Sequence, residues 1–448
     1  MRDPQGRIRL EGDRVLRTLV DPLPADHFLH NELAARLVGE GRLVAFERTG
    51  TTSLTSPRLP FVTQPAEWCD AQLHAAGQLT LDLQREAVSA GFDLKDASAW
   101  NVIFDGCRPV FCDLLSFAAL TERKWWAMGQ YARHFLFPLL ASRRRDLKAH
   151  EVFAMWRDGM PASKARGLFG RSLYLTRYGS LLLGEGGSRG AAHSAVALDD
   201  AKQAASAGSA RPFRNRLHVA LDWMLAGVAP AASPASAGVG WAGYEQDRPH
   251  YAGDSLERKR SIVAEWLAHV RPPWVLDLGC NTGEFSRMAA GHGAEVVALD
   301  ADHDSVERLY RSAPAGARLH PVVAQLDDIG AGRGWAGAEH PGLAARMNQH
   351  FDLVMMLALV HHLAIGAAIP LPAVAGFVRA CSRGWAIVEF VDASDPQLVS
   401  LCRQRQRSPQ DFTIERQRTA FLEAGFSVEC EVALAPAGRS LALLRAGH

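Results

Sequence analysis

The sequence predicts an α/β protein with two domains, in which a doubly wound, mostly parallel sheet follows an N-terminal α+β domain. Three observations carry this prediction. An apolar strand at 274–278 runs through a glycine-containing loop into a helix, and a second apolar strand ends at Asp300. A segment rich in proline, alanine and glycine at 229–240 separates this region from the preceding chain. Strands that alternate with helices form parallel sheets with helices on their faces.

Length and composition agree with this organisation. The 448 residues suffice for two domains, given domain sizes of about 100–200 residues. The formal charge of +1 provides no basic stripe, so a nucleic-acid partner is not expected. Seven cysteines without a C-x-x-C pair suggest reduced thiols in a cytoplasmic protein and no metal site. The first residues are charged and lack an apolar signal core, so neither export nor membrane association is expected.

The N-terminal domain is predicted over residues 1–183. Short apolar runs between charged residues in 1–60 predict a small sheet with one helix, and a further helix is expected over 65–90. Two apolar strands around Asp105-Gly106 predict a hairpin. Several helices are expected over 122–183, whose aromatic residues fit core packing. Residues 184–240 are predicted to be a linker with one helix at about 211–228.

Asp96, Asn101 and Asp113 have the spacing of a catalytic loop followed by a metal-binding aspartate. The pattern resembles protein-kinase-like phosphotransferases, which implies that Asp96 orients a hydroxyl while Asn101 and Asp113 hold Mg²⁺. No glycine-rich phosphate loop or ATP-clamping lysine precedes it, although Arg17 with Glu32 is a candidate substitute. The region is therefore interpreted as a degenerate kinase-like domain with a vestigial phosphotransfer site. Asp96 and Asn101 equally fit turn residues that cap their own loop.

The third domain segment, 241–448, begins with a helix near 254–270. The following loop reads Asp277-x-Gly279-x-Asn281-x-Gly283. Its leading acid disfavours a pyrophosphate, because the two would repel each other, and suits a ligand with an ammonium group. Asp300 lies 23 positions after Asp277, where doubly wound folds place a carboxylate on ribose hydroxyls.

These motifs resemble those of class I S-adenosylmethionine-dependent methyltransferases. The resemblance implies a Rossmann-like seven-stranded sheet with an antiparallel last strand, and S-adenosyl-L-methionine as the cofactor. It also implies that the helix near 254–270 lies over the cofactor, so Tyr251 and Lys259 are candidate lid residues, and the alternative is that both are plain surface positions. The residues expected to bind the cofactor are Asp277, Gly279, Cys280, Asn281, Gly283, Asp300, Ala301, Gln325, Leu326 and Leu357. Gln325 follows the third strand and is the candidate acceptor for the adenine amino group, although which residue contacts adenine stays open. The alternative is another Rossmann-like nucleoside-binding unit.

His361 and His362 follow the fourth strand, at the sheet edge where ligands bind in doubly wound folds. In the related methyltransferases such a pair faces the methyl acceptor. Methyl transfer depends mainly on positioning, and a histidine that titrates near neutral pH suits removal of a proton from the nucleophile. His362 is the preferred catalytic residue and His361 the second, while a structural role is the alternative.

The chain as a whole resembles nodulation-protein-like methyltransferases. The function expected from that resemblance is methyl transfer to a small-molecule or glycan-like acceptor, with the N-terminal domain assisting acceptor recognition. One alternative is a bifunctional methyltransferase-kinase, and another is a non-catalytic S-adenosylmethionine-binding scaffold. The sequence does not define the acceptor or the oligomeric state.

Overall fold

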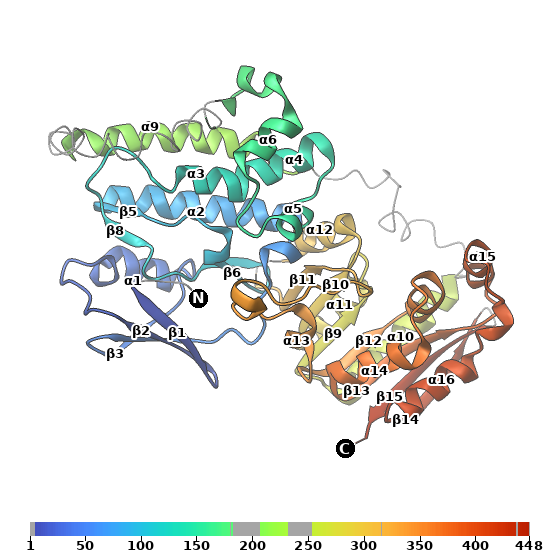
Figure 1. The fold of residues 1–448 in the computed structure, drawn as a ribbon. Coiled ribbons are helices and arrows are strands. Elements are labelled where there is room, and N and C mark those ends of the chain that lie inside the picture. The colour runs from blue at the N-terminus through green and yellow to red at the C-terminus, as the bar shows by residue number, and fades with distance from the viewer. Residues whose placement is uncertain are drawn as a thin grey trace. The chain divides into compact units, whose positions relative to one another are not determined.

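The computed structural model describes residues 5–179, 181, 207–231, 253–314, 316–435 and 438–447. The chain divides into two compact units, Met1–Ala232 and Ser233–His448 (Figure 1). Each unit has its own sheet and its own buried core.

The N-terminal unit opens with an antiparallel sheet in the order β1-β2-β4-β3. Its strands are β1 (Gly6–Glu11), β2 (Arg14–Leu19), β3 (Glu47–Gly50) and β4 (Ser53–Pro57). The short helices η1 (Phe28–His30) and α1 (Glu32–Gly39) lie between β2 and β3 in the chain. Asn31 caps α1 by accepting a hydrogen bond from the backbone N–H of Leu33. The predicted small sheet with one main helix is confirmed.

A long helix and two small strand pairs follow. Helix α2 (Asp70–Ala90), preceded by η2 (Pro65–Glu67), ends at Gly91, which adopts φ 90°. Strands β5 (Phe92–Leu94) and β8 (Phe117–Ala119) pair with each other. Between them come η3 (Ala99–Asn101) and the hairpin of β6 (Val102–Asp105) and β7 (Arg108–Phe111), which turns at the predicted Asp105-Gly106.

The rest of this unit is helical. It contains α3 (Met128–Tyr131), η4 (Ala132–Leu136), α4 (Phe137–Arg145), α5 (Ala149–Met155), α6 (Ala162–Phe169), η5 (Arg171–Leu175) and α9 (Ala207–Ala226). Helix α9 runs alongside α2 (Figure 1). The buried guanidinium of Arg214 on α9 donates to the Asp93 carboxylate at 2.8 Å. The helix predicted within a linker therefore packs into the N-terminal unit, and the glycine- and serine-rich residues 184–206 lie outside the described residues.

The C-terminal unit contains a seven-stranded sheet in the order β11-β10-β9-β12-β13-β15-β14. Its strands are β9 (Trp274–Leu278), β10 (Glu295–Asp300), β11 (Leu319–Val323), β12 (Phe351–Met356), β13 (Ser382–Val391), β14 (Phe426–Leu434) and β15 (Arg439–Ala446). The first five pair in parallel, whereas β15 is antiparallel to both of its neighbours. The predicted Rossmann-like sheet with an antiparallel last strand is confirmed.

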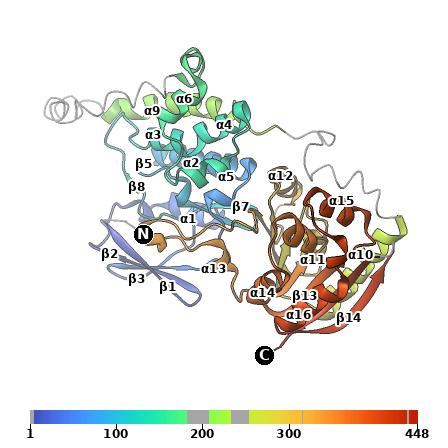
Figure 2. The same ribbon diagram turned by 45° about the vertical axis from the view of Figure 1, so that its right-hand side comes forward.

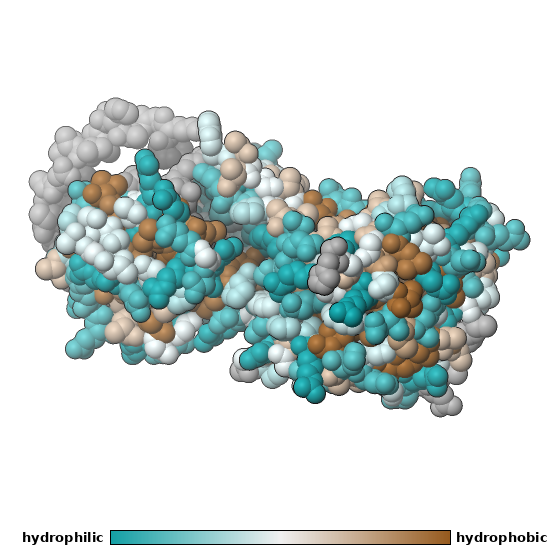
Figure 3. Space-filling view, turned by 90° about the horizontal axis from the view of Figure 1, so that it is seen from below, coloured by the Kyte–Doolittle hydropathy of each residue, from teal (hydrophilic) through white to brown (hydrophobic). Residues whose placement is uncertain are grey.

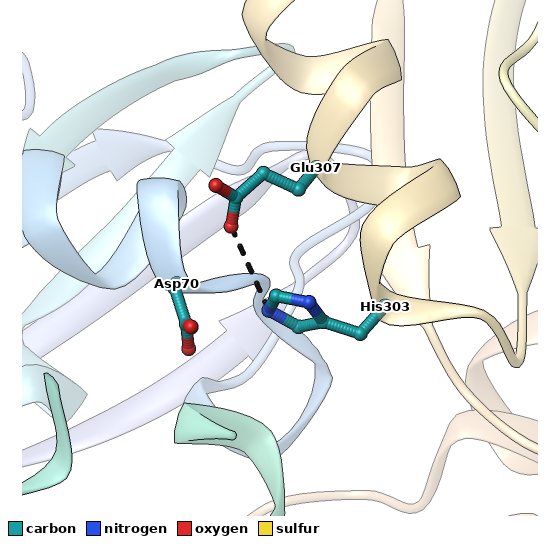
Figure 4. Close-up of side chains that lie close together, drawn as sticks. All are labelled: Asp70, His303 and Glu307. Carbon is teal, nitrogen blue, oxygen red and sulfur yellow. Dashed lines mark ion pairs between the residues drawn. The ribbon is translucent and has the colours of Figure 1, made fainter. Parts of the chain in front are cut away.

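Helices connect these strands as a doubly wound fold requires. They are α10 (Gly253–Val270), α11 (Glu284–Gly291), α12 (His303–Ser312), η7 (Trp335–Gly337), α13 (Leu343–Met347), η8 (His362–Gly366), α14 (Leu371–Cys381), α15 (Pro396–Gln404), η9 (Pro409–Asp411) and α16 (Ile414–Glu423). Helix α10 packs on α11, and α14 packs on α16 (Figure 2). On α12, His303 Nε2 and Glu307 Oε2 are 3.6 Å apart, one turn along the helix (Figure 4).

The parallel register brings the carboxyl ends of the central strands to one edge. Leu278 at the end of β9 pairs with Leu299 of β10 and Met356 of β12, and all three are buried. Hydrophobic residues on the face drawn in Figure 3 form separate patches among hydrophilic ones. Within the described residues, no helix has the length and apolar character needed to cross a membrane.

Candidate active site

The loop between β9 and α11 adopts a left-handed backbone conformation at three positions. Gly279, Asn281 and Gly283 have φ values of 73°, 50° and 82°, a region that favours glycine and tolerates asparagine. The backbone N–H groups of Gly279 and Cys280 donate to the Leu299 carbonyl at 2.8 and 3.0 Å. The loop is therefore fixed against the end of β10. Helix α11 begins at Glu284, with Gly283 as its N-cap.

The Asp300 carboxylate holds together the glycine loop and the turn that follows β10, at the carboxyl edge of the sheet. Its Oδ2 accepts from the backbone N–H of Asn281 at 2.8 Å, and its Oδ1 accepts from the backbone N–H of Asp302 at 2.8 Å. Burial raises the pKa of the Asp300 carboxyl, and these backbone donors oppose that rise. The acid thus holds the glycine loop while it also lines the pocket beside it.

Asp277 is buried on β9, just ahead of the loop, and is 2% exposed. The hydroxyl of Ser286 on α11 donates to its Oδ2 at 2.5 Å. Burial raises the pKa of Asp277 to about 6, with a further increase from the nearby charge of Asp300. An opposite charge in the pocket would lower that pKa again, so the site is prepared for a cation.

A single pocket in this unit joins these residues to the end of β12. It is lined by most of the residues predicted to bind the cofactor, namely Asp277, Gly279, Cys280, Asn281, Asp300, Ala301, Leu326 and Leu357. Both histidines and Lys259 also line it. Sequence reasoning missed Glu284, Phe285, Leu299, Ala324, Asp327, Ala358, Leu359, Leu363, Gln397 and Arg439.

Two of the predicted cofactor residues lie outside the lining. Gly283 is buried beneath the loop, where a Cβ would lie 2.4 Å from Leu309 Cδ1, so its role is to let the loop pack. Gln325 is exposed after β11 and is absent from the pocket wall, whereas Asp327 two residues later is part of it. Asp327 is therefore a better candidate than Gln325 for a contact with a ligand in the pocket, because the chain turns after Gln325 and brings Asp327 to the pocket wall.

The histidine pair lines the same pocket. The ring centroids of His361 and His362 lie 4.2 Å apart, and His362 opens the π-helical turn η8. His361 is 2% exposed, and its Nδ1 has no hydrogen-bond partner within the described part of the chain. Ala358, three residues earlier, has φ 55°, a strained conformation of the kind that clusters at functional sites.

The expectation that a histidine titrates near neutral pH is wrong for both. Burial, followed by the charges of His362 and Arg439, lowers the pKa of His361 to about 3. Burial and then Arg439 lower the pKa of His362 to about 4. Both imidazoles are therefore neutral at physiological pH. The sequence could not reveal this, because both the burial of the rings and the approach of Arg439, which is remote in the chain, are set by the tertiary fold.

A buried ionic cluster lies behind the histidines. Glu389 on β13 accepts from Lys259 Nζ at 2.6 Å through one carboxylate oxygen and from Arg439 Nη1 at 2.9 Å through the other. Arg439 Nε also donates to Asp395 Oδ2 at 2.7 Å. All four residues are at most 5% exposed. Lys259, predicted as a lid residue, is thus held in the pocket wall, and Tyr251 lies outside the described residues.

Comparisons with known proteins identify the family. Residues 244–431 match the family described as a methyltransferase domain. The nodulation protein NoeA of Rhizobium meliloti (strain 1021) is 30% identical over 436 residues, covering 92% of this chain and 88% of the relative. The chain belongs to the NoeA family. Its C-terminal unit is an S-adenosylmethionine-dependent methyltransferase domain, as its sheet and glycine loop indicate.

The chain is also similar to solved structures of other methyltransferases. One is the magnesium protoporphyrin IX methyltransferase of Synechocystis PCC 6803 with bound SAM, at 15% identity and a TM-score of 0.31, covering 43% of this chain and 80% of that one. Another is an S-adenosylmethionine-dependent methyltransferase from Mesorhizobium loti, at 16% identity and a TM-score of 0.30, covering 41% and 97%.

In the N-terminal unit of this NoeA-family chain, Asp96, Asn101 and Asp113 belong to one hydrogen-bonded network. The side-chain amide of Asn101 lies 3.4 Å from the Asp96 carbonyl oxygen and 3.5 Å from Ser116 Oγ. Ser116 Oγ in turn donates to Asp113 Oδ2 at 2.6 Å. Arg17 pairs with Asp113 at 2.9 Å, whereas Glu32, its predicted partner, is exposed.

Proposed function

We propose that the methyltransferase domain methylates a small-molecule or glycan-like acceptor that binds at the histidine end of the pocket. The observation that carries this proposal is the continuous pocket from the glycine loop to His361 and His362. The cofactor supplies an activated methyl group, so the protein's main task is to align a nucleophile with it. A pocket lined both by the glycine-loop residues and by the two histidines can hold the cofactor and the acceptor next to each other.

The residues present fit the cofactor at the loop end. The carboxylates of Asp277 and Asp300 provide acceptors for an ammonium group and for ribose hydroxyls, and both line the pocket. Asp327 provides an acceptor for an adenine amino group in place of Gln325. Gly279 leaves room for close backbone approach, since a Cβ there would lie 3.2 Å from Leu359 Cδ2.

The two histidines serve best as neutral hydrogen-bonding groups. A neutral imidazole orients an acceptor hydroxyl by accepting its hydrogen bond. As the hydroxyl oxygen gains a methyl group it becomes strongly acidic, so even an imidazole with a pKa of about 4 then accepts its proton. His362 is the preferred residue because it is less buried than His361 while lining the same pocket.

The N-terminal unit is proposed to assist acceptor recognition. The phosphotransfer alternative is less favoured, because Asp113 already accepts hydrogen bonds from Arg17, Ser116 and the Leu115 backbone. Asp96 likewise accepts from the Ser98 backbone N–H at 3.0 Å. These contacts support the interpretation that the acids cap their own loops, although binding of ATP with Mg²⁺ would reopen the alternative.

The acceptor class is tested by incubating the protein with S-adenosylmethionine labelled on its methyl group and with fractionated bacterial extracts. We expect label in the small-molecule or glycan fraction and none in nucleic acid. His362→Ala should abolish incorporation while S-adenosylhomocysteine still binds. Residues 233–448 alone should transfer less label than the full chain. Label in the nucleic-acid fraction, or full transfer by the His362 variant, would contradict the proposal.

A further inference from the structure

Lys259 is a cation in the wall of the cofactor pocket whose role neither the motif nor the family comparison explains. It lies on the inner side of α10 and is 5% exposed. Burial of a lysine is costly unless its charge is compensated. The compensation comes from Glu389, whose Oε2 is 2.6 Å from Lys259 Nζ. The ammonium group is therefore fixed in place on the pocket wall rather than extended into solvent.

The position of Lys259 is defined by its neighbours at the glycine-loop end. Its Nζ lies 5.0 Å from the centre of the Phe285 ring, on the first turn of α11. Its charge also acts on Asp277, where it lowers the carboxyl pKa against the effect of burial. Lys259, Phe285 and Asp277 all line the same pocket. A buried cation and a buried carboxylate thus face one end of the cavity together.

Such a pair complements a ligand that carries both charges on one carbon atom. An α-amino acid has an ammonium group and a carboxylate in that arrangement, and the methionine part of the cofactor is an α-amino acid. We propose that Lys259 binds the α-carboxylate of the cofactor, while Asp277 takes its ammonium group. This inference rests on the proposed cofactor site, and it makes Lys259 a specificity-determining residue for the amino-acid end.

Glu389 gives this arrangement its rigidity. One of its oxygens holds Lys259 and the other holds Arg439, so the carboxylate spans two cations that line the pocket. Lys259 Nζ donates to one of these oxygens, so Glu389 fixes the position of the ammonium group beside the pocket. Glu389 is thus a positioning residue, which acts through Lys259 and Arg439.

The test is isothermal titration calorimetry of the full chain with S-adenosylhomocysteine and with its decarboxylated analogue. The wild-type protein should prefer the ligand that carries the carboxylate. In Lys259→Met the affinity for S-adenosylhomocysteine should fall roughly 10- to 100-fold, the range expected for a hydrogen bond to a charged group. Affinity for the decarboxylated analogue should stay unchanged, so the preference disappears. Arg258→Met is the matched control, since Arg258 is an exposed cation on the same helix.

Removal of Lys259 alone leaves Glu389 with one cation fewer, which can destabilise the protein. A second variant, Lys259→Met with Glu389→Gln, removes both charges and should lose the same preference. If either folded variant weakens both ligands equally, or keeps the preference, Lys259 is only structural and the inference is overturned. A wild-type protein that binds both ligands equally also overturns it. Failure of the wild-type protein to bind S-adenosylhomocysteine would instead refute the proposed function.

Discussion

In the proposed cofactor site, Asp277 is the carboxylate expected to bind the ammonium group, and its ionisation depends on pH. Burial raises its pKa to about 6, so the fraction that is ionised falls as the pH decreases through that value. Only the ionised carboxylate attracts an ammonium group. The affinity for S-adenosylhomocysteine should therefore increase from pH 5 to pH 8, by roughly tenfold for a single group with this pKa.

The measurement is calorimetric titration across that pH range. Methylthioadenosine is the matched control ligand, because it lacks the amino-acid group and should bind with an affinity independent of pH. If both ligands show the same pH dependence, the change does not arise from Asp277 and the ammonium group.

The histidine pair gives a second prediction at this scale. Because burial and Arg439 lower both pKa values, to about 3 and about 4, His361 and His362 should remain neutral down to pH 5. Nitrogen NMR of protein labelled at histidine would show this directly, with His361→Ala and His362→Ala identifying the signals. A midpoint between pH 6 and 7 for either residue would contradict this account of their environment.

Among the individual elements, the loop between β9 and α11 has the largest influence on the shape of the proposed cofactor site. Gly283 has φ 82°, and it packs so close to Leu309 that a Cβ atom at this position would lie 2.4 Å from Leu309 Cδ1. Gly283→Ala should destabilise the fold by about 1–2 kcal/mol, the cost of a left-handed conformation for a residue with a Cβ. It should also weaken S-adenosylhomocysteine binding, because the loop has to shift.

Gly291, at the end of the same helix, provides the matched control. A Cβ there meets nothing within 4 Å, and Gly291 is not among the residues with positive φ. Gly291→Ala should leave binding unchanged and preserve or slightly increase stability. Denaturant unfolding and calorimetry of both variants provide the comparison. Equal effects would show that the loop conformation does not require Gly283.

The elements of the C-terminal sheet could be predicted because their signals are local. The order acid, glycine, asparagine, glycine fixes the loop from Asp277 to Gly283, and the apolar strands end in the acids and histidines that line the pocket. Arg439 and Gln397 could not be found this way. They come from the start of β15 and from α15, and only the insertion of β15 beside β13 brings that region to the central strands.

Local sequence signals did not predict features that depend on tertiary contacts. The helix at 207–226 follows a glycine- and serine-rich segment, so the sequence suggested a linker, yet Arg214 fixes it to the N-terminal unit through Asp93. Arg17 was matched with Glu32 by analogy, whereas the fold places it beside Asp113. In each case a buried arginine pairs with an aspartate that is distant in the sequence.

At the scale of the whole molecule, the chain combines a methyltransferase domain with a second compact unit of similar size. We propose that the C-terminal unit binds S-adenosylmethionine through Asp277, Asp300 and the intervening loop. The kinase-like pattern at Asp96, Asn101 and Asp113 lies in the N-terminal unit and is not part of that site. Separate titrations with the two kinds of nucleoside ligand therefore distinguish the roles of the units.

The most direct measurement is calorimetric titration of the full chain with S-adenosylhomocysteine, repeated for Asp300→Ala and repeated with ATP and Mg²⁺. We expect S-adenosylhomocysteine to bind and ATP to show no binding. The Asp300 variant should lose about 1–3 kcal/mol of binding free energy, because buried donors lose their acceptor. No binding of S-adenosylhomocysteine by the wild-type protein would contradict the assignment of the pocket, and unchanged affinity in the variant would remove Asp300 from the site.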